Sequence, residues 1–162
     1  MKDFISMLVL TALTYVAVGA ASQLAMADSA NRMPVDRLPS YQAECASCHL
    51  AYPPGFLPAQ SWSSIMGGLS KHYGTDASVE PKDAAEISAW LKRYAGSYKR
   101  VKEVPPENRI TQSYWFQKKH RKIGVEDFAK PPVKSAANCN ACHRHAEQGN
   151  FDDDDDDVRI PR

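Results

Sequence analysis

Apolar residues recur at helical spacing in two stretches near the middle of the chain. In residues 61–73 the series is Trp62, Ile65, Leu69 and then His72. Steps of three and four residues place these side chains on one face of a helix, and Gly74 stands where such a helix would end. The pattern therefore predicts one continuous amphipathic helix whose apolar face leads up to a histidine.

A second helical pattern covers residues 81–95. Its apolar stripe consists of Ala84, Ile87, Leu91 and Tyr94, with Trp90 beside it. Pro81 suits the first turn of a helix, and Gly96 suits the position just after its end. Pro105-Pro106 and Pro131-Pro132 interrupt the rest of the chain, and no stretch shows the alternation that is typical of a strand. The predicted fold is all-α with long loops.

The N-terminal segment, residues 1–27, has the pattern of a secretory signal peptide. An apolar run extends from Phe4 to Ala20, and Ala25-Met26-Ala27 matches an A-x-A cleavage site. The alternative is an uncleaved membrane anchor, but the run is short and rich in Ala and Thr, whereas a spanning helix needs about 20 strongly apolar residues. We expect export to the periplasm, cleavage near Ala27 and no stable membrane insertion of the remaining chain.

The remaining chain, residues 28–162, has the size of one small domain. Domains of this size are hard to stabilise by side-chain burial alone, so a large buried cofactor would help. The whole sequence of 162 residues has a formal net charge of +1. A near-neutral charge argues against a dedicated nucleic-acid binder, which usually carries a basic excess.

The four cysteines lie in two copies of one motif, C-x-x-C-H, at residues 45–49 and 139–143. This motif is the attachment sequence of c-type haem. Two thiols bond to the vinyl groups of one haem, and the adjacent histidine ligates its iron. The motifs therefore predict two c-type haems as cofactors. The predicted attachment residues are Cys45, Cys48, Cys139 and Cys142, and the predicted proximal iron ligands are His49 and His143.

Other uses of these cysteines fit the pattern less well. A zinc site would need a second histidine at the usual spacing, and a thioredoxin-type dithiol needs a βαβ context that the sequence lacks. Two disulfides suit an exported protein, but they do not explain why each cysteine pair is followed by a histidine. Two copies of the full motif, with no cysteine left over, favour haem attachment.

Both motifs lie in segments that are compatible with a helix. Ser40 can cap a helix over residues 41–50, which would stop before Pro53-Pro54. Ser135 can cap a second helix over residues 136–148, with Gly149 just after its end.

His72 is predicted to be a distal iron ligand, because it extends an apolar face that can cover a buried haem. The sequence does not fix which distal histidine serves which haem, and order along the chain is assumed, with His72 at the first iron. Met66 is the alternative on the same stretch. It lies six residues earlier on a different face of the predicted helix, so the two side chains would hardly serve one iron.

His120 is predicted to be the other distal ligand, assigned to the second iron on the same assumption of order along the chain. It follows Trp115 and Phe116, and Phe116 stands four residues before it on the same helical face. His145 is expected to be exposed, because two residues along a helix turn it away from the iron that His143 would bind. Met33 is the remaining candidate. With His72 and His120 as distal ligands, both haems would be bis-histidine, low-spin and of low potential.

The motifs divide residues 28–162 into a first-haem half, 28–104, a second-haem half, 105–150, and an acidic C-terminal tail, 151–162. Residues 92–134 hold twelve basic and four acidic side chains. This basic stretch would steer an acidic redox partner, or would neutralise haem propionates as an ordinary solvated surface. The run Asp152–Asp157 lacks the glycine and the terminal glutamate of a calcium loop, and a solvated tail is expected.

The sequence resembles the small dihaem cytochrome c family of exported bacterial proteins. The resemblance rests on residues 44–49, 52–54, 62–74, 115–120, 139–143, 146–149 and 158–161. It implies a periplasmic electron carrier with two bis-histidine haems. It also implies redox partners, namely a small high-spin cytochrome c and, for some members, a membrane b-type cytochrome.

Two functional classes are compatible with these features. Electron transfer needs no substrate pocket, and it fits two capped irons in a small domain. A haem enzyme or a gas-binding sensor needs one open or weakly capped iron. The coordination state of the two irons separates these classes, and the predicted histidine ligands favour electron transfer without catalysis.

Overall fold

The computed structural model describes residues 37–98, 101–151 and 158–161. These residues belong to one compact unit, Asn31–Arg162. The predicted signal peptide, Met33 and the run Asp152–Asp157 lie outside the described residues.

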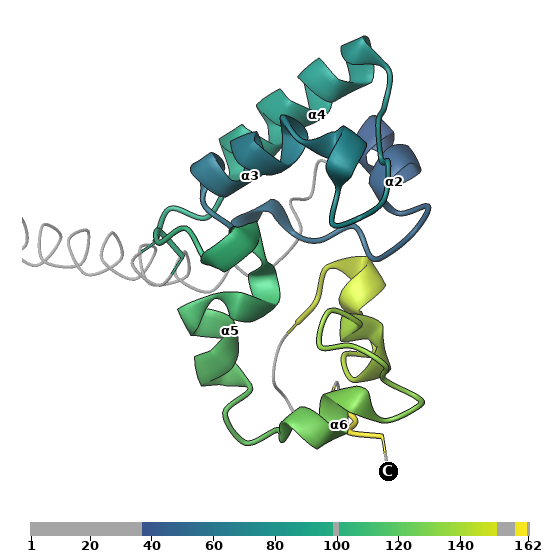
Figure 1. Ribbon diagram of the computed structural model, residues 1–162, viewed down its shortest axis with the longest axis vertical. Coiled ribbons are helices and arrows are strands. Elements are labelled where there is room, and N and C mark those ends of the chain that lie inside the picture. The colour runs from purple at the N-terminus through teal and green to yellow at the C-terminus, as the bar shows by residue number, and fades with distance from the viewer. Residues whose placement is uncertain (1–36, 99–100, 152–157, 162) are drawn as a thin grey trace, which may run out of the picture. The chain divides into compact units, whose positions relative to one another are not determined.

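The secondary structure of the described residues is helical (Figure 1). The α-helices are α2 (Pro39–Cys45), α3 (Ala59–Met66), α4 (Pro81–Tyr94), α5 (Tyr114–Lys119) and α6 (Val125–Ala129). Short 3-10 segments and loops connect them, and strand-like pairing in these ranges is limited to isolated bridges. The prediction of an all-α fold with long loops is therefore confirmed. No helix among the described residues is long and apolar enough to cross a bilayer.

The first hydrophobic cluster forms where α2 and α3 pack on α4. Its buried members are Tyr41, Ala51, Leu57, Trp62, Ile87 and Leu91. The α4 helix follows its sequence pattern: Pro81 occupies the first turn, and Ile87 and Leu91 are the buried residues of its apolar stripe. Figure 1 shows α3 and α4 side by side.

The second hydrophobic cluster consists of Phe56, Val101, Trp115 and Phe116. The 3-10 segment Pro54–Phe56 connects it to the first cluster through two tryptophans. The indole Nε1 of Trp62 donates to the Pro54 carbonyl at 2.7 Å, and that of Trp115 donates to the Phe56 carbonyl at 3.1 Å. One short segment therefore anchors a buried tryptophan from each half of the chain.

Gly96 is required by the close approach of three segments. A Cβ atom there would lie 2.4 Å from Val101 and 2.5 Å from the Gly55 carbonyl oxygen. The Gly96 amide donates to the Leu57 carbonyl at 2.9 Å. Any side chain would push apart the end of α4, the 54–57 segment and Val101, which is itself buried.

The prediction of one continuous helix over residues 61–73 is wrong. The α3 helix ends at Met66, Gly67 and Gly68 follow, and a 3-10 turn over Leu69–Lys71 precedes His72. Paired glycines are poor helix formers, and they allow the chain to leave the helix axis. His72 therefore stands in a loop and not on the face of α3.

The helices predicted around the two motifs are shorter than expected. The α2 helix begins with Pro39 in its first turn and ends at Cys45, and the Ser40 hydroxyl donates to Glu86 instead of capping. The second motif forms 3-10 turns over Cys139–Ala141 and Ala146–Gln148. An α-helix is interrupted there because the Cys142 carbonyl accepts from the Arg159 amide at 2.8 Å, beside the bridge between His143 and Val158.

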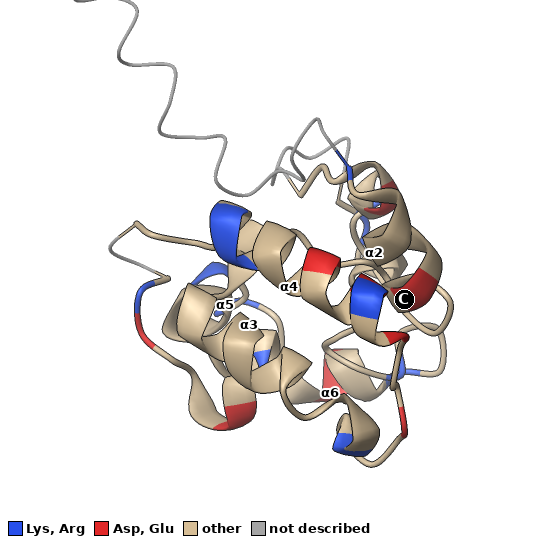
Figure 2. Ribbon diagram, turned by 90° about the horizontal axis from the view of Figure 1, so that it is seen from above, with Lys and Arg blue, Asp and Glu red and all other residues tan. Residues whose placement is uncertain are grey.

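Two helices, α4 and α5, have basic side chains in their last turns. Lys92 and Arg93 stand in the last turn of α4, and Lys118 and Lys119 stand in the last turn of α5. Figure 2 shows basic residues in blue at one end of α4. Cations at these positions are favourable next to the partial negative charge of a helix C-terminus. They are part of the basic stretch 92–134.

Candidate functional site

The first centre is a pair of histidines from two loops. The ring centroids of His49 and His72 lie 6.1 Å apart, and their planes differ by 23°. His49 ends the first motif, and His72 follows the 3-10 turn after α3. The backbone bridge between His72 and Thr75 closes the loop behind His72.

Neighbouring groups fix the ring of His49. Its Nδ1 donates to the Leu50 carbonyl at 2.7 Å, because a carbonyl can only accept. This bond favours the tautomer with its proton on Nδ1, which leaves Nε2 as the nitrogen that can bind a metal. The ring of Tyr52 stacks on that of His49 with centroids 5.0 Å apart.

The second centre is a pair from α5 and the second motif. The ring centroids of His120 and His143 lie 6.2 Å apart, and their planes are inclined by 80°. His120 is the residue that ends α5, and its Nδ1 donates to the Phe116 carbonyl at 2.8 Å. The Phe116 ring also stacks on His120 with centroids 4.0 Å apart.

Desolvation favours the neutral form of both predicted distal histidines, because it lowers their pKa. Desolvation lowers the pKa of His72, and the neighbouring His49 adds to the effect. Desolvation also lowers the pKa of His120, partly offset by its bond to the Phe116 carbonyl. Neutral imidazole is the form that binds a metal, so the environment of each side chain favours the ligating state.

The four cysteines stand beside these pairs and none forms a disulfide. Burial raises the pKa of Cys45 to about 11 and that of Cys139 to about 11. Desolvation also raises the pKa of Cys142. A raised pKa keeps these sulfurs as thiols at neutral pH, the form from which a thioether to a vinyl group is made.

The ring separation in both histidine pairs is compatible with one metal bound between the two rings. Histidine nitrogen lies about 2.0–2.1 Å from a bound metal, and each ring centroid lies about 1 Å further out on the same axis. A metal between two imidazoles therefore places the centroids about 6 Å apart, close to the observed 6.1 and 6.2 Å. The neutral donors and the adjacent thiols fit a covalently attached haem at each pair.

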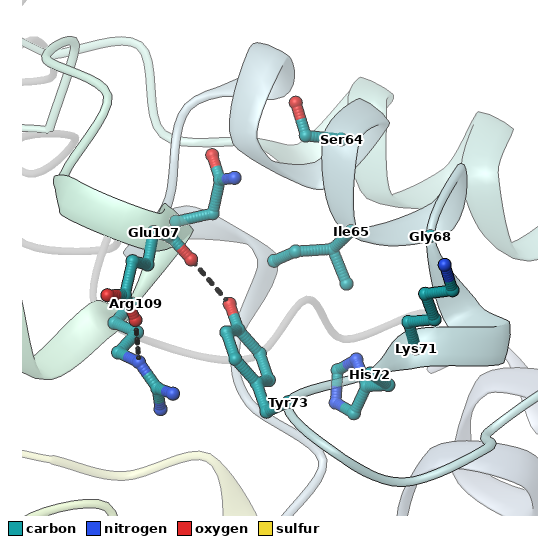
Figure 3. A pocket seen from close by; sticks show the side chains of 9 residues that line it. Ser64, Ile65, Gly68, Lys71, His72, Tyr73, Glu107 and Arg109 are labelled. Carbon is teal, nitrogen blue, oxygen red and sulfur yellow. Dashed lines mark hydrogen bonds and ion pairs between the residues drawn. The ribbon is translucent and has the colours of Figure 1, made fainter.

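A pocket of about 460 Å³ adjoins His72 (Figure 3). The Tyr73 hydroxyl donates to the Glu107 carbonyl at 2.9 Å across it. Arg109 lies over the Tyr73 ring at 4.2 Å and pairs with the Glu107 carboxylate at 2.7 Å. These contacts tie the residue after His72 to residues 107–109.

The same pocket contains strained backbone. Tyr73, Glu107 and Asn108 all have positive φ values, between 50° and 57°. Such angles are costly for residues other than glycine, and they persist where the surroundings hold them. Sequence reasoning missed this arrangement, because no local pattern pairs position 73 with position 107.

Tyr52 is a second residue whose role the sequence did not reveal. Its ring stacks on His49, and its hydroxyl donates to the Ala137 carbonyl at 2.9 Å. Ala137 stands two residues before Cys139. Burial and the Cys139 side chain raise the pKa of Tyr52 to about 12. One side chain thus connects the first histidine pair to the second motif.

The remaining candidates lie elsewhere. Met66 is partly buried against the first hydrophobic cluster at the end of α3. His145, expected to be exposed, is half-buried. Its carbonyl accepts from Gln148 and Asn150 in the turn that ends at Gly149.

A helical domain in which two C-x-x-C-H motifs each stand at a histidine pair is a c-type cytochrome with two haem centres. Residues 41–151 match the family model of dihaem cytochrome c. The chain is 37% identical to the crystal structure of a dihaem c-type cytochrome from Shewanella baltica OS155, with a TM-score of 0.65, covering 76% of this chain and 92% of that one.

A dihaem cytochrome c from Rhodobacter sphaeroides gives a similar result. It is 32% identical with a TM-score of 0.64, and the match covers 74% of this chain and 99% of that one. The search of curated proteins returned no match. The chain belongs to the dihaem cytochrome c family, and membership implies two c-type haems as its cofactors.

Proposed function

We propose that the protein is a periplasmic electron carrier with two covalently attached, low-spin haems, each held by two histidines. The observation that carries this proposal is the geometry of the two pairs, with ring centroids 6.1 and 6.2 Å apart. An iron capped on both sides has no open position for a substrate. The function is then electron transfer without catalysis.

Each side chain has a separate task in this proposal. Cys45 and Cys48 attach the first haem, and His49 and His72 bind its iron. Cys139 and Cys142 attach the second haem, and His143 and His120 bind its iron. The residues 28–104 and 105–150 accordingly form the two haem-binding halves, and residues 151–162 form an acidic tail.

The bound haems supply reversible one-electron storage. The protein holds the ligands in place, so that little rearrangement accompanies the change of charge. The Leu50 and Phe116 carbonyls keep the Nδ1 protons of His49 and His120 in place. Hydrogen bonds of this kind also raise the basicity of the ligating nitrogen, which favours the ferric state and a low potential.

The proposed partners are other redox proteins. The basic stretch 92–134 includes Lys92 and Arg93 at the end of α4 and Lys118 and Lys119 at the end of α5. A surface of this sign attracts acidic partners. A small high-spin cytochrome c is the proposed partner, with a membrane b-type cytochrome as a further one. The signal peptide pattern of residues 1–27 supports the periplasmic location.

An absorption series on the haem-loaded protein tests this function. Spectra are recorded in the ferric state, after dithionite reduction, and after addition of carbon monoxide. We expect two low-spin haems per chain and no change with carbon monoxide. A high-spin component or a carbon monoxide complex in the wild type would refute the assignment and would favour a haem enzyme or a gas sensor.

A further inference from the structure

The two histidine pairs differ in the relative orientation of their rings. The His49 and His72 planes are 23° from parallel, whereas the His120 and His143 planes cross at 80°. The separations are nearly equal, and the two pairs differ in the angle between their ring planes. This difference concerns the electronic structure of any iron bound between the rings.

Phe116 sets the orientation of His120. Its carbonyl accepts from His120 Nδ1 at 2.8 Å, which fixes the direction of the ring edge. Its own ring covers one face of His120 at 4.0 Å and 23°. The backbone amide of Phe116 is in turn held by the Ser113 hydroxyl at 3.3 Å, and the side chain is buried.

The first centre also has an aromatic ring stacked on a histidine, but its two histidine planes are nearly parallel. The Tyr52 ring stacks on the ligand from the motif, His49, at 5.0 Å and 23°, and the His72 plane is inclined to that of His49 by the same angle. In the second centre the stacked aromatic is on the distal histidine instead. The ring of His143 has Phe151 at 5.7 Å, inclined by 55°.

Ring orientation acts on the ferric iron through its π orbitals. An imidazole donates into the iron dπ orbital that lies perpendicular to the ring plane. Parallel rings donate into the same orbital and separate the two dπ levels widely. Crossed rings donate into different orbitals and leave the two levels nearly equal in energy. Nearly equal levels produce a highly anisotropic magnetic signal, whereas separated levels produce a rhombic one.

We infer that Phe116 is a positioning residue that holds His120 across His143, so that the second haem is a crossed-ligand, highly anisotropic centre and the first is a parallel-ligand, rhombic one. This inference rests on the proposed bis-histidine ligation. It adds that the two haems are electronically different although their ligand sets are the same.

Electron paramagnetic resonance of the fully oxidised, haem-loaded protein tests the inference. We expect one rhombic signal with three resolved g values and one signal with a single large g value, in equal amounts. Two rhombic signals in a protein that is fully low-spin and inert to carbon monoxide would overturn the inference while leaving the proposed function intact. A high-spin signal in place of the highly anisotropic one would overturn both.

Substitutions at position 116 test whether the stacked Phe116 ring causes the signal with the large g value. Phe116→Leu removes the stacked ring but keeps the backbone carbonyl, so the large g value should fall as His120 gains freedom to turn. Phe116→Tyr keeps the ring and should preserve the wild-type signal. Tyr52→Leu removes the ring stacked on His49 and should alter the rhombic signal. Tyr52→Phe is its control, because it loses the hydroxyl bond to Ala137 but keeps the ring. An unchanged large g value in a folded Phe116→Leu protein would contradict the positioning role, and the wild-type spectrum decides the orientation if that variant does not fold.

Discussion

The two halves of the protein use the same motif on different supports. In the first half the motif begins at Cys45, the last residue of α2, and six buried side chains from three helices and their loops form a core of their own. In the second half the motif lies in 3-10 turns beside a bridge to Val158. The members of the second cluster that come from residues 105–150 are Trp115 and Phe116, and Phe56 and Val101 come from the first half. The comparison indicates that the first half derives much of its stability from side-chain packing, whereas the second depends more on its haem.

Removal of each haem should reveal this difference most strongly. In a Cys139→Ser/Cys142→Ser variant, we expect amide hydrogens in residues 105–151 to exchange as in an unfolded chain. In a Cys45→Ser/Cys48→Ser variant, the amides of α4 should remain protected, because Ile87 and Leu91 stay packed. Hydrogen exchange followed by mass spectrometry measures both, and equal loss of protection in the two halves would contradict the comparison.

Removal of one distal histidine should open one iron and leave the other unchanged. His72→Ala and His120→Ala proteins are each expected to show one high-spin haem and to bind one carbon monoxide per chain. The wild type should bind none. Because the His120→Ala change also removes a side chain packed on Phe116, it should lower thermal stability more than His72→Ala does. Absorption spectra with carbon monoxide titration give the stoichiometry, and a variant that remains fully low-spin would contradict the assignment of that histidine.

Side-chain truncations in the two hydrophobic clusters should lower the free energy of unfolding by different amounts. Leu91→Ala in the first cluster is expected to lower the free energy of unfolding by about 2–5 kcal/mol. Val101→Ala in the second cluster removes two methylene equivalents and should cost about 1–2 kcal/mol. Denaturant titrations of the haem-loaded proteins provide both values. A larger loss for Val101→Ala would reverse the proposed order of the two cores.

Loss of single hydroxyl groups should have the smallest effects. Tyr52→Phe removes the bond to Ala137 and Tyr73→Phe removes the bond to Glu107, each worth about 0.5–1.5 kcal/mol. Tyr73 is exposed whereas Tyr52 is half-buried, so the loss for Tyr73→Phe should lie at the lower end of that range. The aromatic contacts with His49 and Arg109 remain in these variants, and the absorption spectra should not change. The same denaturant titrations compare the two proteins.

The sequence predicted the features that depend on local chemistry. The stripe of α4, its start at Pro81 and the contact between Phe116 and His120 follow from spacing along one helix. The course of residues 67–75 did not follow, because an apolar series at helical spacing conceals the effect of two adjacent glycines. The interrupted second motif depends on Arg159 and Val158, which are distant in sequence, and no local rule indicates that they compete for its backbone. The α6 helix is short and was not predicted.

In the candidate site, too, some features could be predicted from the sequence and others could not. The motif residues and both distal histidine candidates could be named from the sequence. The ring orientations, the contact between Tyr73 and Glu107 and the link from Tyr52 to Ala137 are tertiary contacts between distant segments. Such contacts can be identified only in the folded chain, because the identity of a side chain does not determine which backbone carbonyl its hydroxyl or imidazole will bind.

Near-infrared magnetic circular dichroism of the oxidised protein tests the central claim most directly, because the energy of the low-spin charge-transfer band identifies the axial ligand pair. The account predicts that both haems contribute bis-imidazole bands, with no histidine–methionine band. A histidine–methionine band at either haem would contradict it and would identify a methionine such as Met66 as the true ligand in place of His72 or His120.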